Sequence, residues 1–156
     1  MSYITKEGMQ YLQKRLKYLM EERPKVIDQV AEARDLGDLS ENAEYHAARE
    51  KQRYIDSEFD DLKKKIGAAQ VIDPATLPKD SVRFGFTVKI QKEGSSDISH
   101  HRIVGIDEIY QRDDGIILTS IASPLGKALL GKKTGDLVVV KAPKGDIKYR
   151  ILDFES

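Results

Sequence analysis

The chain has 156 residues, of which 26 are Lys or Arg and 26 are Asp or Glu, so its formal net charge is zero. This balance argues against a protein that holds nucleic acid through bulk positive charge. The absence of cysteine excludes a disulfide framework and a thiolate zinc site. No apolar run approaches the roughly 18 residues of a membrane helix, and no signal-peptide core is evident, so we expect a cytoplasmic protein.

The first half of the chain carries two apolar repeats with steps of three and four residues, which are typical of coiled-coil seams. The first repeat consists of Met9, Leu12, Leu16, Leu19, Val26, Val30 and Ala33. The second consists of Ala48, Gln52, Ile55, Phe59, Leu62, Ile66 and Ala69. Two helices of about 30 residues with a short connection predict an antiparallel hairpin roughly 45 Å long.

Capping residues mark where these helices begin and end. Thr5 is a candidate N-cap of the first helix, and Pro24 is expected to bend that helix or interrupt its hydrogen bonding locally. Gly37 suits a left-handed residue that stops the first helix. The turn of the hairpin is therefore expected between the two apolar repeats.

The sequence changes character near Asp73–Pro78, where Pro-bounded residues predict a linker. We expect two domains, a helical hairpin over residues 1–75 and a small sheet domain over residues 76–156, which together make an α+β protein. In the second domain, Ser123 is predicted to cap a short helix that starts at Pro124 and stops at Gly131. The rest predicts a twisted antiparallel sheet, with strand candidates at residues 82–90, 99–104, 116–120, 137–141 and 147–154.

Acidic side chains gather at the predicted turn, and two interpretations of them stay open. Asp38 and Glu41 are three residues apart, so at the start of the second helix they would share one face and could bind a hard cation such as Mg²⁺. The same spacing is also a capping box, with Asp38 as N-cap and Glu41 reaching back to the backbone. Spacing alone favours the capping interpretation, whereas the long rod favours delivery of carboxylates to a partner that holds most of the metal.

A short basic cluster follows on the second helix and includes Arg49 and Arg53, one turn apart. It is either a phosphate-contacting patch behind the acidic tip or a solvated face paired with Glu50 and Asp56. His46 is more typical of a surface residue than of a metal ligand. Nucleophile-elbow, P-loop and dinucleotide fingerprints are absent, so a self-contained enzyme is not indicated.

The segment from Ala33 to Glu50, ARDLGDLSENAEYHAARE, closely resembles the tip of the Gre-type bacterial transcript cleavage factors. The resemblance continues in the same order along the rest of the chain. It includes Ala69–Asp73, Arg102–Gly105, Ser123–Leu125 and Leu130–Lys132.

This resemblance implies an N-terminal coiled-coil hairpin and a C-terminal domain of FKBP-like fold that docks on RNA polymerase. The hairpin would enter the secondary channel of the polymerase. Asp38 and Glu41 would help to hold the second Mg²⁺ of the polymerase and position water, so that the polymerase cleaves backtracked RNA near its 3′ end. The protein would bind no cofactor by itself, since the Mg²⁺ lies in the polymerase active site. We expect the protein to be a monomer.

The resemblance also implies roles for other residues. Arg34 and Arg49, with Arg53 beside them, match a basic spot proposed to contact the extruded RNA. Ser123, Pro124 and Leu125 match the segment used for polymerase docking, although a helix cap alone also explains Ser123.

Ser40 stands at a position that is often basic in one subtype of the family, and serine there is more typical of the other subtype. The extensive basic face of that other subtype is not evident, so we expect the first subtype, which is associated with short cleavage fragments. Two rival hypotheses are a channel-binding polymerase inhibitor without cleavage activity and a coiled-coil scaffold without a polymerase role. A prolyl isomerase activity of the second domain is disfavoured, because its few aromatic residues do not assemble a convincing pocket.

Overall fold

The computed structural model describes residues 2–37 and 42–156. The chain divides into two compact units. The hairpin unit is Gln10–Ala68, and the sheet unit combines Met1–Met9 with Ala69–Ser156. In the part of the chain that the structure describes, no helix combines the length and apolar character needed to cross a membrane.

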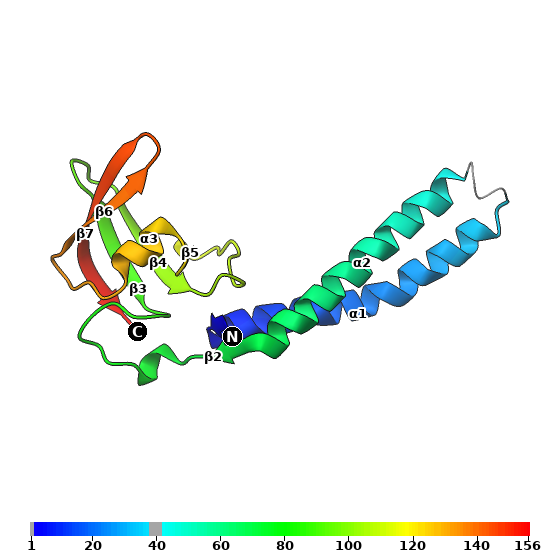
Figure 1. Cartoon of the computed structure of the whole chain (residues 1–156), viewed down its shortest axis with the longest axis horizontal. Helices are drawn as coiled ribbons and strands as arrows, with labels where there is room; N and C mark the ends of the chain where they lie inside the picture. The colour runs from blue at the N-terminus through cyan, green and yellow to red at the C-terminus, as the bar shows by residue number, and fades with distance from the viewer. Residues whose placement is uncertain (1, 38–41) are drawn as a thin grey trace. The chain divides into compact units, whose positions relative to one another are not determined.

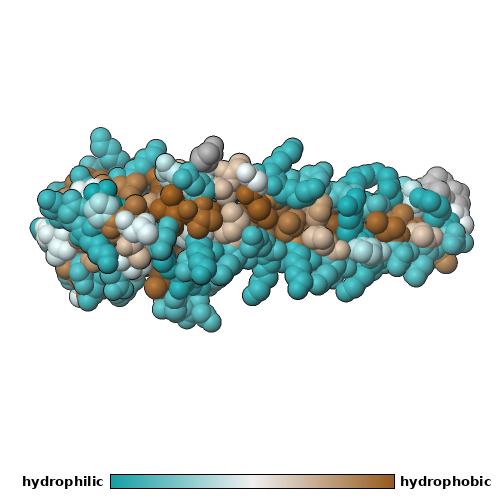
Figure 2. All heavy atoms as spheres, turned by 90° about the horizontal axis from the view of Figure 1, so that it is seen from below, coloured by the Kyte–Doolittle hydropathy of each residue, from teal (hydrophilic) through white to brown (hydrophobic). Residues whose placement is uncertain are grey.

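The hairpin unit consists of two antiparallel helices, α1 (Lys6–Arg34) and α2 (Ala43–Ala68) (Figure 1). Apolar residues follow the hairpin between hydrophilic flanks (Figure 2). The predicted seam is confirmed within the two helices, where seven of its residues are each at most 6% exposed, but its last predicted residue, Ala69, belongs to a strand. The seven residues are Leu12, Leu19, Val26, Val30, Ala33, Ile55 and Leu62.

The ends of α1 follow the predicted capping residues. Thr5 is the N-cap, since its Oγ1 accepts a hydrogen bond of 3.0 Å from the backbone N–H of Gly8. After the last residue of the helix, Gly37 has φ = 129°, a backbone conformation that favours glycine. Pro24 lies inside α1, which continues through it without a break.

The main sheet of the sheet unit has the strand order β5-β4-β3-β7-β6. Its strands are β3 (Thr87–Lys92), β4 (Ile98–Val104), β5 (Ile116–Ser120), β6 (Leu137–Ala142) and β7 (Gly145–Glu155). The α+β fold class is confirmed. The expectation of a purely antiparallel sheet is wrong at one pair, because β4 and β5 run parallel. Residues 105–115 between them are long enough to return the chain to the start of β4 before β5 begins.

The first strand of this sheet also begins later than predicted. Residues 82–86 lie outside the strands, with a turn at Phe84 and Gly85, so the predicted strand 82–90 is wrong over that stretch. Val82 exchanges backbone hydrogen bonds of 2.8 Å with Gly131 and Lys132, and it therefore does not pair with a neighbouring strand. Gly85 has φ = 81°, and a Cβ built on it would lie 2.3 Å from Pro74 Cγ, so this turn requires glycine.

One apolar core holds the sheet and the short helix α3 (Pro124–Leu129) together. As predicted, Ser123 caps α3 by accepting a 3.0 Å hydrogen bond from the backbone N–H of Gly126. Two further strands, β1 (Ser2–Ile4) and β2 (Ala69–Val71), form a small parallel sheet, and η1 (Pro74–Thr76) is a short 3₁₀ helix in the predicted linker. The core consists of Val82, Phe86, Val88, Ile90, Ile103, Leu129, Val138 and Ile151.

Candidate functional site

The two predicted tip carboxylates, Asp38 and Glu41, lie outside the described residues, between Gly37 and Asn42. The shared face of the two acids therefore stays a prediction. The structure does show where the second helix begins, since α2 starts at Ala43.

Asn42 is the residue that caps α2. Its Oδ1 accepts a 3.0 Å hydrogen bond from the backbone N–H of Tyr45, and its carbonyl oxygen accepts one of 3.2 Å from His46. An asparagine is a standard N-cap when its side-chain oxygen accepts a hydrogen bond from the backbone N–H three residues further along the chain. The capping-box interpretation, with Asp38 as N-cap of α2, is thus wrong. The carboxylates of Asp38 and Glu41 are not needed to begin this helix.

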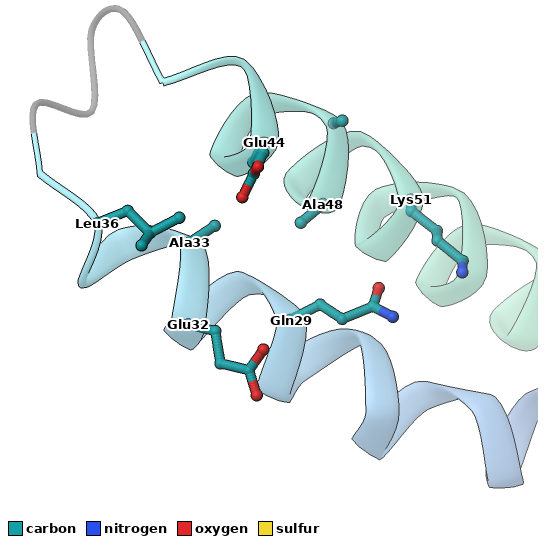
Figure 3. Close-up of a pocket in the computed structure, with 8 residues that line it drawn as sticks. Gln29, Glu32, Ala33, Leu36, Glu44, Ala48 and Lys51 are labelled. Carbon is teal, nitrogen blue, oxygen red and sulfur yellow. The ribbon is translucent and has the colours of Figure 1, made fainter.

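A groove of about 470 Å³ lies between the two helices beside the turn (Figure 3). Ala33 and Ala48 point into the gap from opposite helices, and the longer side chains of Gln29 and Lys51 extend into it (Figure 3). The groove is lined by Gln29, Glu32, Ala33, Leu36, Glu44, Ala47, Ala48 and Lys51.

The three predicted RNA-contacting arginines are on the hairpin unit, and two of them have partners on their own helix. Arg49 donates a 3.0 Å hydrogen bond to Gln52, and Arg53 forms a 2.8 Å ion pair with the exposed Glu50. Arg34 is exposed in the last turn of α1, where a cation offsets the negative end of the helix dipole. The structure therefore shows local partners for Arg49 and Arg53.

The prediction that Asp56 pairs with this basic cluster is wrong. Asp56 pairs instead with Arg23 across the hairpin, at 2.9 Å. Spacing along a sequence indicates only pairs within one helix. A pair between long side chains of two neighbouring helices follows no such spacing, so the sequence pointed to a partner on the same helix.

The histidines do not converge on a common site. His46 is exposed on α2, with its ring against that of Tyr45 at 5.5 Å. On β4, His100 is exposed and His101 is buried, which confirms that they face opposite sides. The ring of His101 lies between the hydroxyls of Ser99 at 2.9 Å and Thr119 at 2.8 Å. Burial lowers the pKa of His101, with a smaller contribution from the neighbouring His100.

The predicted docking segment begins α3. Ser123 donates a 2.7 Å hydrogen bond to the carbonyl oxygen of Ser120 in addition to capping the helix. Leu125 packs against the apolar core, whereas Pro124 is exposed. Of the three residues, Pro124 is thus the one most available to a partner.

Sequence reasoning missed Glu108, which is buried at 1% exposure. Its Oε2 accepts hydrogen bonds of 2.9 Å from the backbone N–H groups of Thr5 and Gly105, and its Oε1 accepts one from the Thr5 hydroxyl. The carboxylate therefore anchors the residue that starts α1 within the sheet unit. Thr5 and Glu108 are 103 residues apart, so no local spacing predicts their contact. Only the Gly-x-x-Glu pattern from Gly105 to Glu108 indicates that this segment is special.

Among the residues that the structure describes, no group of three or more His, Asp or Glu side chains is placed to hold a metal ion. These features define a two-part α+β protein in which a small mixed-sheet unit accompanies a long helical hairpin.

Comparisons with known proteins identify the family. Residues 2–71 match the family description "Transcription elongation factor, N-terminal", and residues 77–156 match "Transcription elongation factor, GreA/GreB, C-term". The chain belongs to the GreA/GreB family of transcription elongation factors.

Similar proteins share nearly the whole chain. Transcription elongation factor GreA of Acidiphilium cryptum is 48% identical over 96% of this chain and 94% of its own length. The protein of that name from Rhodospirillum rubrum is 46% identical over 95% and 93%. Among solved structures, GreA factor homolog 1 of Thermus thermophilus is 23% identical over 99% of this chain and 98% of its own, with a TM-score of 0.44. The family assignment rests on the two family matches and on these sequence relatives.

Proposed function

We propose that this protein enters the secondary channel of bacterial RNA polymerase and stimulates cleavage of backtracked RNA by the polymerase itself. The observation that carries the proposal is the capping of α2 by Asn42, which leaves Asp38 and Glu41 free of that structural role. Full-length similarity to proteins named transcription elongation factor GreA supports the same function.

In this proposal, Asp38 and Glu41 supply two carboxylates to a Mg²⁺ ion of the polymerase active centre and orient the attacking water. Carboxylates suit this hard cation, which commonly takes only one or two of them from a protein. When bound, Mg²⁺ stabilises the charge that develops on the phosphate during hydrolysis. The protein is thus an accessory factor, and the polymerase remains the enzyme.

The reaction consumes one water molecule. Its oxygen bonds to the phosphorus, the bond from phosphorus to the 3′ oxygen breaks, and that oxygen takes a proton. The RNA that stays on the template therefore ends in a 3′ hydroxyl and can be extended again, while the released fragment carries the phosphate.

The remaining expected residues have supporting roles in the proposal. Arg34, Arg49 and Arg53 contact the phosphates of the extruded RNA, which requires Arg53 to exchange its exposed pair with Glu50 for a phosphate. Ser123, Pro124 and Leu125 contact the polymerase, chiefly through the exposed Pro124. We propose that the protein acts as a monomer.

The test adds the protein to a backtracked elongation complex that carries end-labelled RNA. The expected result is shortened RNA that extends again on addition of nucleotides, with stimulation lost in Asp38→Ala and in Glu41→Ala while both variants still bind the polymerase. Full cleavage by both variants would contradict the role of the tip carboxylates. Arrest without shortening would instead identify a channel-binding inhibitor, and failure to bind core polymerase would identify a scaffold.

A further inference from the structure

Asn42 holds both sides of the hairpin turn at once. Its Oδ1 accepts from the backbone N–H of Tyr45 in α2, and its Nδ2 donates a 2.6 Å hydrogen bond to the carbonyl oxygen of Ala33 in α1. The two contacts use the two ends of one partly buried amide. One side chain thereby joins the last turn of α1 to the first turn of α2.

The position of Ala33 makes this bridge specific. Ala33 is 4% exposed, and its carbonyl is among the last four of α1, which have no partner within the helix. That oxygen also accepts a 3.2 Å hydrogen bond from the backbone N–H of Leu36. The Asn42 amide therefore adds a second donor to a carbonyl that is fixed at the end of the buried seam.

Few side chains could replace Asn42 here. Ser, Thr and Asp all supply the acceptor that an N-cap needs. Only an amide of this length also presents N–H donors about 2 Å from that acceptor oxygen. A requirement for a cap alone would be met by any of these residues, whereas the bridge to Ala33 requires asparagine.

We propose that Asn42 is a positioning residue for transcript cleavage, because its bridge fixes the two ends of the segment that carries Asp38 and Glu41. The inference rests on the proposed function of those carboxylates. Positioning matters in this chemistry, since displacement of a ligand or an oriented water by about 1 Å can lower a rate up to a hundred-fold.

The test compares Asn42→Asp and Asn42→Ser with the unmodified full-length protein in the labelled-RNA assay. Both variants keep the cap oxygen, but Asn42→Asp places an oxygen without a hydrogen against the Ala33 carbonyl, and the serine is too short to reach it. At saturating factor, the cleavage rate should fall between about ten-fold and a hundred-fold. The factor concentration for half-maximal effect should stay unchanged, and the Mg²⁺ concentration for half-maximal rate should rise. A purely structural role would not move the Mg²⁺ requirement.

Arg23→Ala is the matched control for general weakening of the hairpin. It removes the 2.9 Å ion pair with Asp56 and the stacking of Arg23 over Phe59, and it should leave the Mg²⁺ requirement unchanged. Full cleavage by Asn42→Asp and Asn42→Ser, with loss only in Asn42→Ala, would overturn the inference in favour of a simple cap.

Two comparisons of cleavage activity between variants separate this inference from the proposed function. If Asp38→Ala and Glu41→Ala lose cleavage while Asn42→Asp keeps it, the positioning role alone fails. If those two alanine variants keep cleavage, the proposed function fails. The bridge itself is then tested by NMR. The Asn42 side-chain amide, assigned by its disappearance in Asn42→Ser, should be protected from solvent exchange, and rapid exchange would contradict the bridge.

Discussion

In the sheet unit, strands from distant parts of the sequence enclose one apolar core, and Phe86, Ile103 and Ile151 within it are fully buried. In the hairpin unit, a single seam joins two helices, and the flanks of both helices face solvent. Cross-helix ion pairs such as Arg15–Glu58 and Arg23–Asp56 supplement that seam. Loss of one contact should therefore affect the whole sheet unit but only a local stretch of the hairpin.

This difference fits the proposed roles, in which the sheet unit contacts the polymerase and the hairpin unit carries the tip carboxylates. A closed core holds a docking surface in one shape, because each strand is supported by its neighbours. A hairpin whose seam contacts follow one another along its two helices can change residues at its turn without unfolding the other unit. Substitutions in the two units should then differ in size and in how far their effects spread.

The largest difference is expected between two phenylalanines. Phe86→Ala removes a ring that is 0% exposed and stacks on Phe154 at 6.1 Å, so it should lower the free energy of unfolding of the sheet unit by about 3–5 kcal/mol. Phe59→Ala removes a partly buried ring of the hairpin seam and should cost about 1–2 kcal/mol.

Urea unfolding of the full chain, with amide hydrogen exchange reporting on each unit, measures both effects. Phe86→Ala should expose amides throughout the main sheet, whereas Phe59→Ala should expose only those near its position on the hairpin. Equal losses, or exchange that spreads as widely for Phe59→Ala, would contradict the contrast between the units.

A smaller effect is expected where α1 begins. Glu108→Ala leaves the backbone N–H groups of Thr5 and Gly105 without their buried acceptor, which should cost about 2–3 kcal/mol. Gly8→Ala should also destabilise, because its Cβ would lie 2.2 Å from Glu108 Oε1. The exposed Asp113→Ala is the control and should change stability little.

Urea unfolding gives the size of these changes, and exchange of the Met9 amide, which bonds to the Thr5 carbonyl, locates them. Faster exchange of Met9 in Glu108→Ala but not in Asp113→Ala is the expected pattern. An unchanged Met9 amide would show that Glu108 does not hold the start of α1.

The contrast between the units also explains what the sequence could predict. The hairpin seam and the caps Thr5 and Ser123 follow from spacings within a few residues, and the structure confirms them. The parallel pairing of β4 with β5 and the contact from Glu108 to Thr5 depend on which distant segments meet. Local periodicity does not contain that information.

The candidate site shows a second kind of failure. Asp38 and Asn42 are both good N-cap residues, and the Asp-x-x-Glu spacing favoured the first. Asn42 caps α2 and also contacts the Ala33 carbonyl of α1, a contact that exists only when the two helices are packed. Local spacing contains no information about that second contact.

The smallest predicted effect concerns the pH dependence of the hairpin unit. The hydrogen bond from Arg15 to Glu58, with help from Tyr54, lowers the pKa of Glu58 below its usual 4.5. A carboxyl whose pKa is lower in the folded state contributes stability above its unfolded pKa, and that contribution disappears as the pH falls through the folded value. Because Arg15 and Glu58 are partly exposed, the contribution at pH 7 should be about 0.5 kcal/mol.

Thermal unfolding of the full chain at pH 7 and near pH 3, with exchange of the hairpin amides, measures this contribution. Glu58→Gln should lower hairpin stability at pH 7 and flatten the loss of stability on acidification. Glu50→Gln is the matched control, since its 2.8 Å pair with Arg53 lies within one helix and both side chains are largely exposed. If both variants flatten the pH profile equally, the cross-helix pair contributes no more than a surface pair, and the hairpin depends on its apolar seam alone.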